Sequence, residues 1–345
     1  MIVGVVADPG FSTRLAQILT DRLPELLRAT PLDASAEVDV ENVALTLPPA
    51  TDGSPALDEW FDVLQHKFDL VLVVSEMPRR QASRAVVAEV FRDRMCVFYT
   101  PSFGVLGTSR RLLRTVADLL PHLLGTGASG PAPAGTRWVA DADGGGRLVS
   151  TSPLGRVRLV AGMVRGNRPW RLIPALSGAF GAASAASAFG VFYASIWQMA
   201  ASMSVARLTL VTLAVLVAVS TWLIVPNGLW ERPSFRSTRA DRVLYNSATL
   251  GTVVAGAVCM YGLLLLAVML AAVVVVPDDY LAEQLGAPAT LATYVKLAWL
   301  AASLGIAAGA VGSTTSDRTE ILRATYGRRE VERRQAADRE KDAET

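Results

Sequence analysis

Residues 243–277 read VLYNSATLGTVVAGAVCMYGLLLLAVMLAAVVVVP and carry no charged side chain. A helix needs about 20 apolar residues to cross the hydrocarbon core of a bilayer. This tract is longer than that, so a helix formed by it would tilt or project beyond the bilayer. The tract therefore predicts a transmembrane helix.

Three further tracts have the same character. Residues 172–200 and 208–230 are uncharged, and residues 291–311 contain only Lys296, near their start. Buried helices of soluble proteins seldom reach these lengths without a charge. We predict a transmembrane domain over residues 172–313, an all-α four-helix bundle with helices at about 172–200, 206–227, 245–276 and 290–313.

The basic residues beside these tracts predict an orientation. Arginine-rich segments precede the first predicted helix, separate the second from the third and follow the fourth. The two remaining loops hold Arg207 in one and Asp278, Asp279 and Glu283 in the other. Basic loops stay in the cytoplasm, so we expect both termini there. The chain opens without the basic region of a signal peptide.

Composition narrows the class of protein. A formal net charge of +2 at pH 7 indicates no nucleic-acid partner. Lysine is scarce beside arginine, and alanine and glycine are abundant; we interpret this as GC-rich coding in a bacterium, hence a bacterial cytoplasmic membrane. Cys96 and Cys259 lie in different settings and predict neither a disulfide nor a zinc site. Residues 314–345 alternate acids with bases, as a solvated cytoplasmic tail does.

Small side chains recur on the first and fourth predicted transmembrane helices. Such stripes let helix backbones approach closely in lipid. We favour packing within the bundle, and the alternative is a homo-oligomer interface. The predicted packing residues are Gly178, Ala182, Ala186, Gly190, Ala301, Gly305 and Gly309.

The N-terminal residues alternate between strand-like and helix-like patterns. Such alternation predicts an α/β domain with a doubly wound parallel sheet, Rossmann-like or flavodoxin-like, over residues 1–125. The expected strands are residues 2–7, 38–47, 70–74 and 96–99. The expected helices are residues 13–27, 56–66, 81–92 and 109–124.

Residues 126–171 form a predicted linker and juxtamembrane segment. It begins rich in Gly, Pro, Ala and Ser, and residues 138–150 suit a short hairpin. Residues 153–170 are basic and partly amphipathic, which suits a helix resting on anionic lipid. Simple topology signalling is the alternative. The predicted membrane-surface residues are Arg156, Arg158, Arg165, Arg168 and Arg171.

Polar residues follow three of the predicted strands. Ligands of open α/β sheets bind beyond the carboxyl ends of the strands, and the start of the first helix can hold an anion. The same residue types also cap helices, which is the plainer interpretation. The candidate ligand-binding residues are Asp8, Gly10, Ser12, Thr13, Ser75, Glu76, Thr100 and Ser102.

No motif identifies a cofactor or a catalytic residue. Residues 4–11 do not contain the dinucleotide fingerprint G-x-G-x-x-G, and neither the P-loop nor the serine nucleophile elbow occurs in the sequence. The two histidines, His66 and His122, both fall within predicted helices and offer too few ligands for a metal cluster. The cofactor is left open, and no metal is expected.

Residues 162–171, GMVRGNRPWR, with Pro174 and Leu176, resemble a pattern in a family of actinobacterial membrane proteins. The opening VGVVADPG at residues 3–10 and the segment WLIV…GLWER at residues 222–232 are similar to it too. The resemblance covers nearly the whole chain. It implies a cytoplasmic α/β domain followed by a four-helix transmembrane region, and it implies no activity.

Three functions are compatible with these patterns. The first is a membrane-anchored cytoplasmic domain that regulates by binding a small ligand or a partner protein. The second is a hydrolase or transferase at the inner leaflet that uses Asp8, Glu76, Ser75 or Ser102. The third is a small-solute channel or permease, which the lack of ionisable residues inside the predicted spans disfavours. We favour the first, without catalysis.

Overall fold

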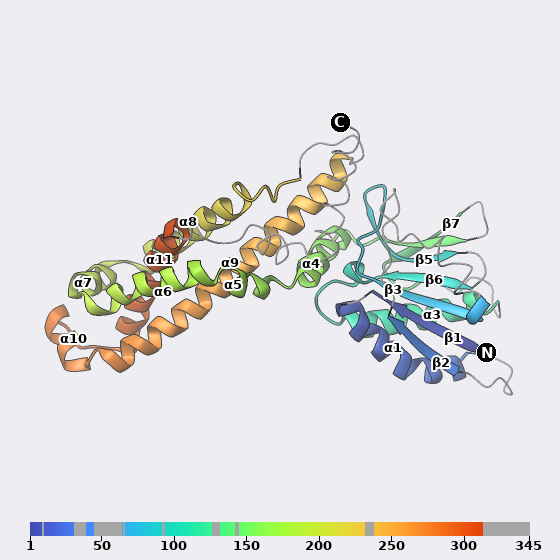
Figure 1. Ribbon diagram of the computed structural model, residues 1–345, viewed down its shortest axis with the longest axis horizontal. Helices are drawn as coiled ribbons and strands as arrows, with labels where there is room; N and C mark the ends of the chain where they lie inside the picture. The colour runs from blue at the N-terminus through green and yellow to red at the C-terminus, as the bar shows by residue number, and fades with distance from the viewer. Residues whose placement is uncertain are drawn as a thin grey trace. The chain divides into compact units, whose positions relative to one another are not determined.

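Buried aliphatic runs form the strands of a mixed sheet in the computed structural model (Figure 1). The structure describes residues 1–8, 10–30, 39–44, 64, 66–91, 94–125, 132–141, 145–231 and 238–312, the side chains of 44 and 311–312 excepted. Among these residues the chain divides into two units, Met1–Gly166 and Asn167–Thr345. The predicted boundary at residue 125 would separate two strands and a helix from the first unit. The predicted helix at 56–66 lies largely outside the described residues, and the tail at 314–345 lies entirely outside them.

The first unit is an eight-stranded α/β sheet in the order β2-β1-β3-β6-β5-β8-β7, with β4 paired to β5. The parallel strands are β1 (Ile2–Ala7), β2 (Asp39–Ala44), β3 (Leu70–Ser75) and β6 (Met95–Tyr99). The antiparallel strands are β4 (Arg80–Gln81), β5 (Arg84–Phe91), β7 (Thr136–Ala140) and β8 (Gly146–Ser150). The parallel half agrees with the predicted strands, and β7 with β8 agrees with the predicted hairpin.

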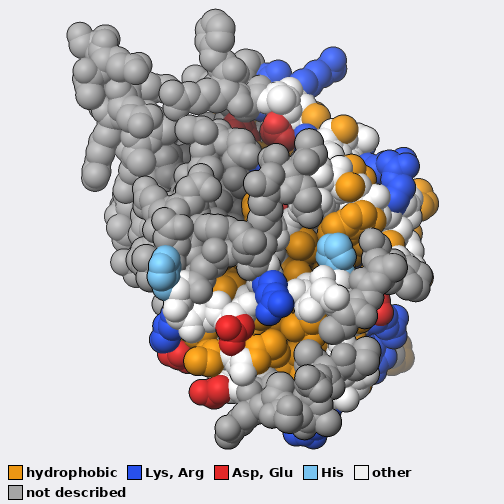
Figure 2. All heavy atoms as spheres, turned by 90° about the vertical axis from the view of Figure 1, so that its right-hand side faces the viewer, with side chains coloured by type: hydrophobic (Ala, Val, Ile, Leu, Met, Phe, Trp, Pro, Cys, Tyr) orange, Lys and Arg blue, Asp and Glu red, His pale blue; other side chains and the backbone are white. Residues whose placement is uncertain are grey.

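Helices α1 (Phe11–Arg28) and α3 (Thr108–Leu123) pack on one face of this sheet. Their apolar stripes contribute residues such as Leu19 and Val116, which share a core with Val5 of β1. Val6 of β1 and Phe68 belong to a separate core on the opposite face. Figure 2 shows the side of this unit that faces right in Figure 1, where basic, acidic and apolar side chains are interspersed.

The predicted helix at residues 81–92 is wrong, because β5 occupies this segment. Residues 85–90 are all buried, since β5 lies between β6 and β8 with cores on both faces. Three of them are valine, whose branched side chain favours a strand. The sheet is therefore mixed, and a fully parallel doubly wound sheet is not what forms.

The second unit is helical. It contains η2 (Pro169–Arg171), α5 (Leu172–Ala175), α6 (Ser177–Phe192), α7 (Ala194–Ser202), α8 (Val205–Ile224), α9 (Arg239–Val275), α10 (Asp278–Leu285) and α11 (Leu291–Gly312). Among the described helices, α8, α9 and α11 are each long and apolar enough to cross a membrane. A fourth candidate exists only if the stretch 155–175 and α6, bent by 60°, count as one span.

The first predicted span, 172–200, is thus broken into α5, α6 and α7. Leu176 departs from helical geometry at the first break (φ −109°, ψ 27°). Tyr193 is extended at the second break (φ −104°, ψ 114°). The Trp197 indole N–H donates to the Gly190 carbonyl oxygen at 3.1 Å, which satisfies an acceptor next to that break.

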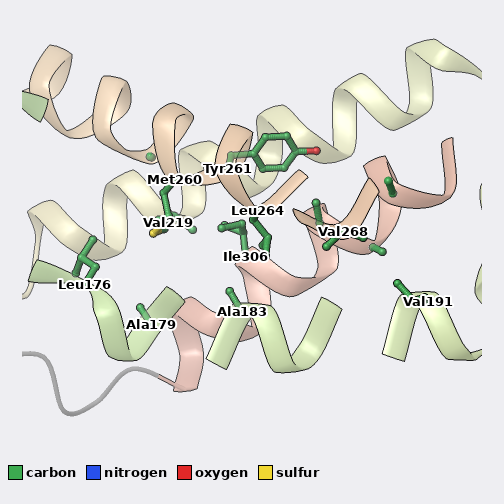
Figure 3. Packing of buried hydrophobic residues seen from close by; sticks show 14 of the residues in the cluster. Leu176, Ala179, Ala183, Val191, Val219, Met260, Tyr261, Leu264, Val268 and Ile306 are labelled. Carbon is green, nitrogen blue, oxygen red and sulfur yellow. The ribbon is translucent and has the colours of Figure 1, made fainter. Parts of the chain in front are cut away.

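One large apolar core joins these helices (Figure 3), and a smaller cluster of Ala200, Leu208 and Leu300 lies apart from it. It includes Ala183 of α6, Val219 of α8, Leu264 of α9 and Ile306 of α11. Side chains facing away from this core, such as Val274 (82% exposed), are also apolar. Apolar residues both inside and outside are what a helix in lipid requires.

Candidate functional site

The ends of β1 and β3 bring three predicted residues together. The Ser75 hydroxyl donates to Asp8 Oδ2 at 2.9 Å, and the Glu76 backbone N–H donates to the same oxygen at 3.1 Å. Asp8 and Ser75 are both fully buried. Because β1 and β3 are adjacent and parallel, their carboxyl ends share one edge of the sheet. We call this edge, together with the start of α1, the strand-end rim.

The start of α1 is capped by the protein's own carboxylate. Glu76 Oε1 accepts from the backbone N–H groups of Phe11 (2.5 Å) and Ser12 (3.0 Å). Gly10 has φ +141°, and a Cβ there would lie 2.8 Å from Glu76 Oε1. The place in which an anion was predicted is therefore taken by Glu76. A negative charge at a helix N-terminus is stabilising.

The remaining rim residues have local hydrogen bonds. Thr13 Oγ1 accepts from the Gly10 N–H at 3.1 Å and donates to the Asp8 carbonyl oxygen at 3.0 Å. The Ser12 hydroxyl is fully buried and has no hydrogen-bond partner among the described residues. Thr100 and Ser102 lie in η1 (Thr100–Phe103), directly after β6. Ser102 donates to the Val86 carbonyl oxygen at 2.6 Å.

Helix α4 (Gly155–Asn167) packs on the rim. Gly162 lies so close to η1 that a Cβ on it would overlap the carbonyl group of Pro101. The Arg165 guanidinium stacks on the Phe11 ring, with its Cζ 4.1 Å from the ring centroid. Arg165 also donates to Thr108 Oγ1 at 2.7 Å. The juxtamembrane helix is thus part of the α/β unit up to Gly166.

The five predicted membrane-surface arginines differ in their surroundings. Arg156 is exposed and donates to the Ser83 carbonyl oxygen at 2.9 Å. Arg158 and Arg165 are partly buried against the α/β unit. Arg171 is exposed and Arg168 half-buried. Lipid contact stays a prediction for all five.

A second polar cluster lies between β5, β6 and β8. The Glu89 carboxylate accepts from the Tyr99 hydroxyl at 2.7 Å and from Arg147 Nε at 2.6 Å, and Arg79 Nε lies 3.7 Å away. Burial raises the pKa of Tyr99 well above its usual value, and the negative charge of Glu89 raises it further. Burial likewise raises the pKa of the Cys96 thiol.

Sequence reasoning missed this second cluster. Glu89 fell inside the segment predicted as a helix, and Arg147 is far from it along the chain. The strongest available signal was a glutamate within a run of valines. Its carboxylate, hydroxyl and guanidinium groups satisfy one another, which is typical of a buried structural ion pair.

Contacts between α6 and α11 use small residues. A Cβ on Gly305 would overlap Ser187 Oγ and lie 2.6 Å from the Ala183 carbonyl oxygen. Gly309 and Gly190 are equally close to the facing helix. On α6 the buried small residues are Ala179, Ala183, Ser187 and Gly190, whereas the predicted Gly178 is exposed and Ala182 and Ala186 are half-buried. The contacting stripe is therefore offset from the predicted one by one residue over most of its length.

Four side chains also tie α8, α9 and α11 together. Trp299 Nε1 donates to Thr212 Oγ1 at 2.7 Å, and Ser303 Oγ lies 3.1 Å from Thr212 Oγ1 and 3.0 Å from the Tyr261 hydroxyl. The sequence showed only scattered polar residues here. These polar groups therefore satisfy one another within the helical unit.

No group of three or more His, Cys, Asp or Glu residues suited to a metal ion occurs in the part of the chain that the structure describes. No family model, no curated protein and no solved structure matches this chain. The resemblance noted from the sequence therefore stays a prediction.

Proposed function

We propose that the chain is an integral protein of a bacterial cytoplasmic membrane that anchors an α/β regulatory domain, with both termini in the cytoplasm. The membrane assignment is supported by α8, α9 and α11, three helices of sufficient length and apolarity. Two cytoplasmic termini further require the bent stretch that includes α6 to cross the membrane as a fourth span. The orientation is supported by the placement of arginine beside them. The domain binds a small ligand or a partner protein.

The regulatory role rests on one observation, the packing of α4 on the strand-end rim. Gly162 and Arg165 contact η1, Phe11 and the start of α3, which are the elements beside which ligands of α/β sheets bind. The same helix leads along the chain to Leu172, where the apolar helices begin. A ligand at the rim would therefore change the contacts of the segment that joins the domain to the membrane.

The orientation can be tested with single cysteines in a background in which Cys96 and Cys259 are alanine. Ser204→Cys and Thr290→Cys should react with a membrane-impermeant maleimide on intact spheroplasts, because their loops lie outside. Gln17→Cys, on the exposed side of α1, should react only after lysis. Labelling of Gln17→Cys on intact spheroplasts would overturn the orientation.

Ligand binding can be tested with the full chain in detergent. A panel of nucleotides, sugar phosphates and amino acids is screened for a rise in Tm, and cross-linking in cells is used to find a partner protein. A ligand at 100 times its Kd should stabilise the protein by about 2.7 kcal/mol. The rise should vanish in Ser12→Val, which removes a buried hydroxyl at the rim, and persist in Thr20→Val, about two turns along α1. No Tm rise with any compound, together with no cross-linked partner, would refute the proposal.

The two alternatives have less support. Asp8 and Glu76 do lie at one edge of the sheet, as an enzyme would need, but each carboxylate accepts backbone N–H groups. These bonds favour structural roles for both carboxylates. A permease would need a polar path, whereas Thr212, Tyr261 and Ser303 bond one another. Lys296 donates to the carbonyl oxygens of Ala201 and Met203 at the end of α7.

A further inference from the structure

Four arginines from three helices gather beside the loop between β6 and α3. Arg158 of α4 and Arg111 of α3 meet at Gly104, where an added Cβ would lie 2.6 Å from Arg158 Cγ and 3.6 Å from Arg111 Nη1. Arg165 of α4 stacks on Phe11, one helical turn from Arg14 of α1. We call Arg14, Arg111, Arg158 and Arg165 the four-arginine cluster.

The cluster has excess positive charge. None of its members forms an ion pair with a carboxylate of the described residues. Burial and then the charge of Arg111 lower the pKa of Arg158, and burial and then the charge of Arg14 lower the pKa of Arg165. Guanidinium groups held together in this way repel one another. An anion placed among them would relieve that repulsion.

The neighbouring backbone also suits an anion. Helix α3 begins at Thr108 without a side-chain cap and without an acid in its first turn. Its first N–H groups point out of the helix start, where negative charge is favoured. Unlike the start of α1, which Glu76 occupies, this helix start has guanidinium groups around it. The geometry fits a phosphate group, which arginine recognises with paired N–H donors.

Apolar side chains are exposed next to this cluster. Leu106, at the tip of the loop between β6 and α3, is 80% exposed, and Val105 is 42% exposed. Leu154 at the start of α4 and Val157 one turn on are 62% and 65% exposed. Exposed apolar residues beside clustered arginines are typical of a surface that enters the headgroup region of an anionic bilayer.

We propose that the four-arginine cluster binds the phosphate of an anionic phospholipid, with Val105 and Leu106 entering the bilayer surface. This rests on the proposed function, because it requires the domain to lie beside a membrane. The chain supports that requirement, since α4 ends at Asn167 and the apolar helices begin at Leu172. A ligand at the strand-end rim would then bind beside the lipid surface.

The test uses the full chain in dodecyl maltoside, with phosphatidylglycerol, phosphatidylcholine and inorganic phosphate as probes. Native mass spectrometry measures the affinity for each lipid. The cluster variant is Arg111→Gln/Arg158→Gln. The control is Arg110→Gln/Arg137→Gln, which removes the same charge from two exposed arginines outside the cluster and outside the predicted membrane-surface residues. We expect the cluster variant to lose about tenfold in affinity for phosphatidylglycerol, or ~1.4 kcal/mol, and the control to lose much less.

A further variant covers the case in which the glutamine variant does not fold. Arg111→Lys/Arg158→Lys keeps both charges but loses the paired donors, and it should bind phosphatidylglycerol more weakly than wild type. Equal losses in cluster and control variants would overturn the proposal, as would equal binding of phosphatidylcholine. If millimolar inorganic phosphate displaces the lipid, the proposal is also overturned, and the cluster binds a soluble phosphate ligand instead. The labelling experiment distinguishes a failure of this proposal from a failure of the proposed function. If Ser204→Cys and Thr290→Cys react on intact spheroplasts, the membrane assignment holds and only the lipid-binding role of the cluster is wrong.

Discussion

Replacing Gly305 by leucine is expected to separate α11 from α6 and to leave little monodisperse protein in detergent. A Cβ at Gly305 would overlap Ser187 Oγ and lie 2.6 Å from the Ala183 carbonyl oxygen. The serine hydroxyl can rotate, at the cost of its 3.2 Å bond to the Ala301 carbonyl oxygen, but the backbone oxygen can move only with its helix. Overpacking costs about 1–3 kcal/mol where side chains can adjust. Here a whole helix must shift, so the loss should be larger.

The matched controls are glycines with open space around them. Gly181 on α6 and Gly262 on α9 would have no atom within 4 Å of an added Cβ. Leucine favours a helix over glycine by somewhat under 1 kcal/mol, so Gly181→Leu and Gly262→Leu should purify like wild type. Size-exclusion profiles and Tm values in one detergent give the comparison. A wild-type profile for Gly305→Leu would show that α6 and α11 do not pack as described.

Composition explains why the α6 stripe was predicted one residue away. Residues 177–190 are mostly Gly, Ala and Ser, so small side chains occur on every side of the helix. Periodicity alone cannot select one side of such a helix. The partner selects it, because Gly305 and Gly309 of α11 lie against the carbonyl oxygens of Ala183 and Ala179.

The strand-end rim was partly predictable. Parallel strands end at one edge, so the joining of Asp8 and Ser75 followed from the order of the elements. The direction of the Glu76 side chain could not be predicted in this way, because a helix start that is open and one that is capped have the same local sequence. The stacking of Arg165 on Phe11 could not be predicted either, since these two residues lie far apart in the chain. Local patterns thus indicated which residues meet at the rim, but not that Glu76 accepts from the first N–H groups of α1.

Strand β5 is the part of the sheet that local sequence patterns predicted wrongly. A strand buried on both faces lacks the alternation that identifies a half-buried strand, and residues 85–90 of β5 are all buried. The pairing that determines its conformation comes from β8, whose residues 146–150 lie far along the chain. Arg147 of β8 supplies the guanidinium group that pairs with the buried Glu89 carboxylate.

Replacing Glu89 by alanine is expected to destabilise the α/β unit by about 3–5 kcal/mol, the usual cost of breaking a buried ion pair. Arg147 and Tyr99 would each lose a hydrogen bond and remain buried or half-buried beside Arg79. The control is Glu41→Ala. It breaks an exposed pair with Lys67 whose side chains are 46% and 56% exposed, and exposed pairs contribute at most about 1 kcal/mol. Hydrogen exchange of β6 amides in the full chain gives both free energies.

The pH dependence separates the charge of Glu89 from its packing. Burial and then Glu89 raise the pKa of Tyr99 in the folded state, from an ordinary value of 10.0. The resulting stability is complete below about pH 10 and is lost as the pH rises through the folded-state pKa, because the unfolded state releases its proton first. In Glu89→Gln the charge is absent, so the folded-state pKa falls and the total alkaline loss becomes smaller. Hydrogen exchange is too fast at high pH, so the loss is followed by Tm from pH 8 to 12. An alkaline loss in Glu89→Gln as large as in wild type would show that burial alone raises the Tyr99 pKa.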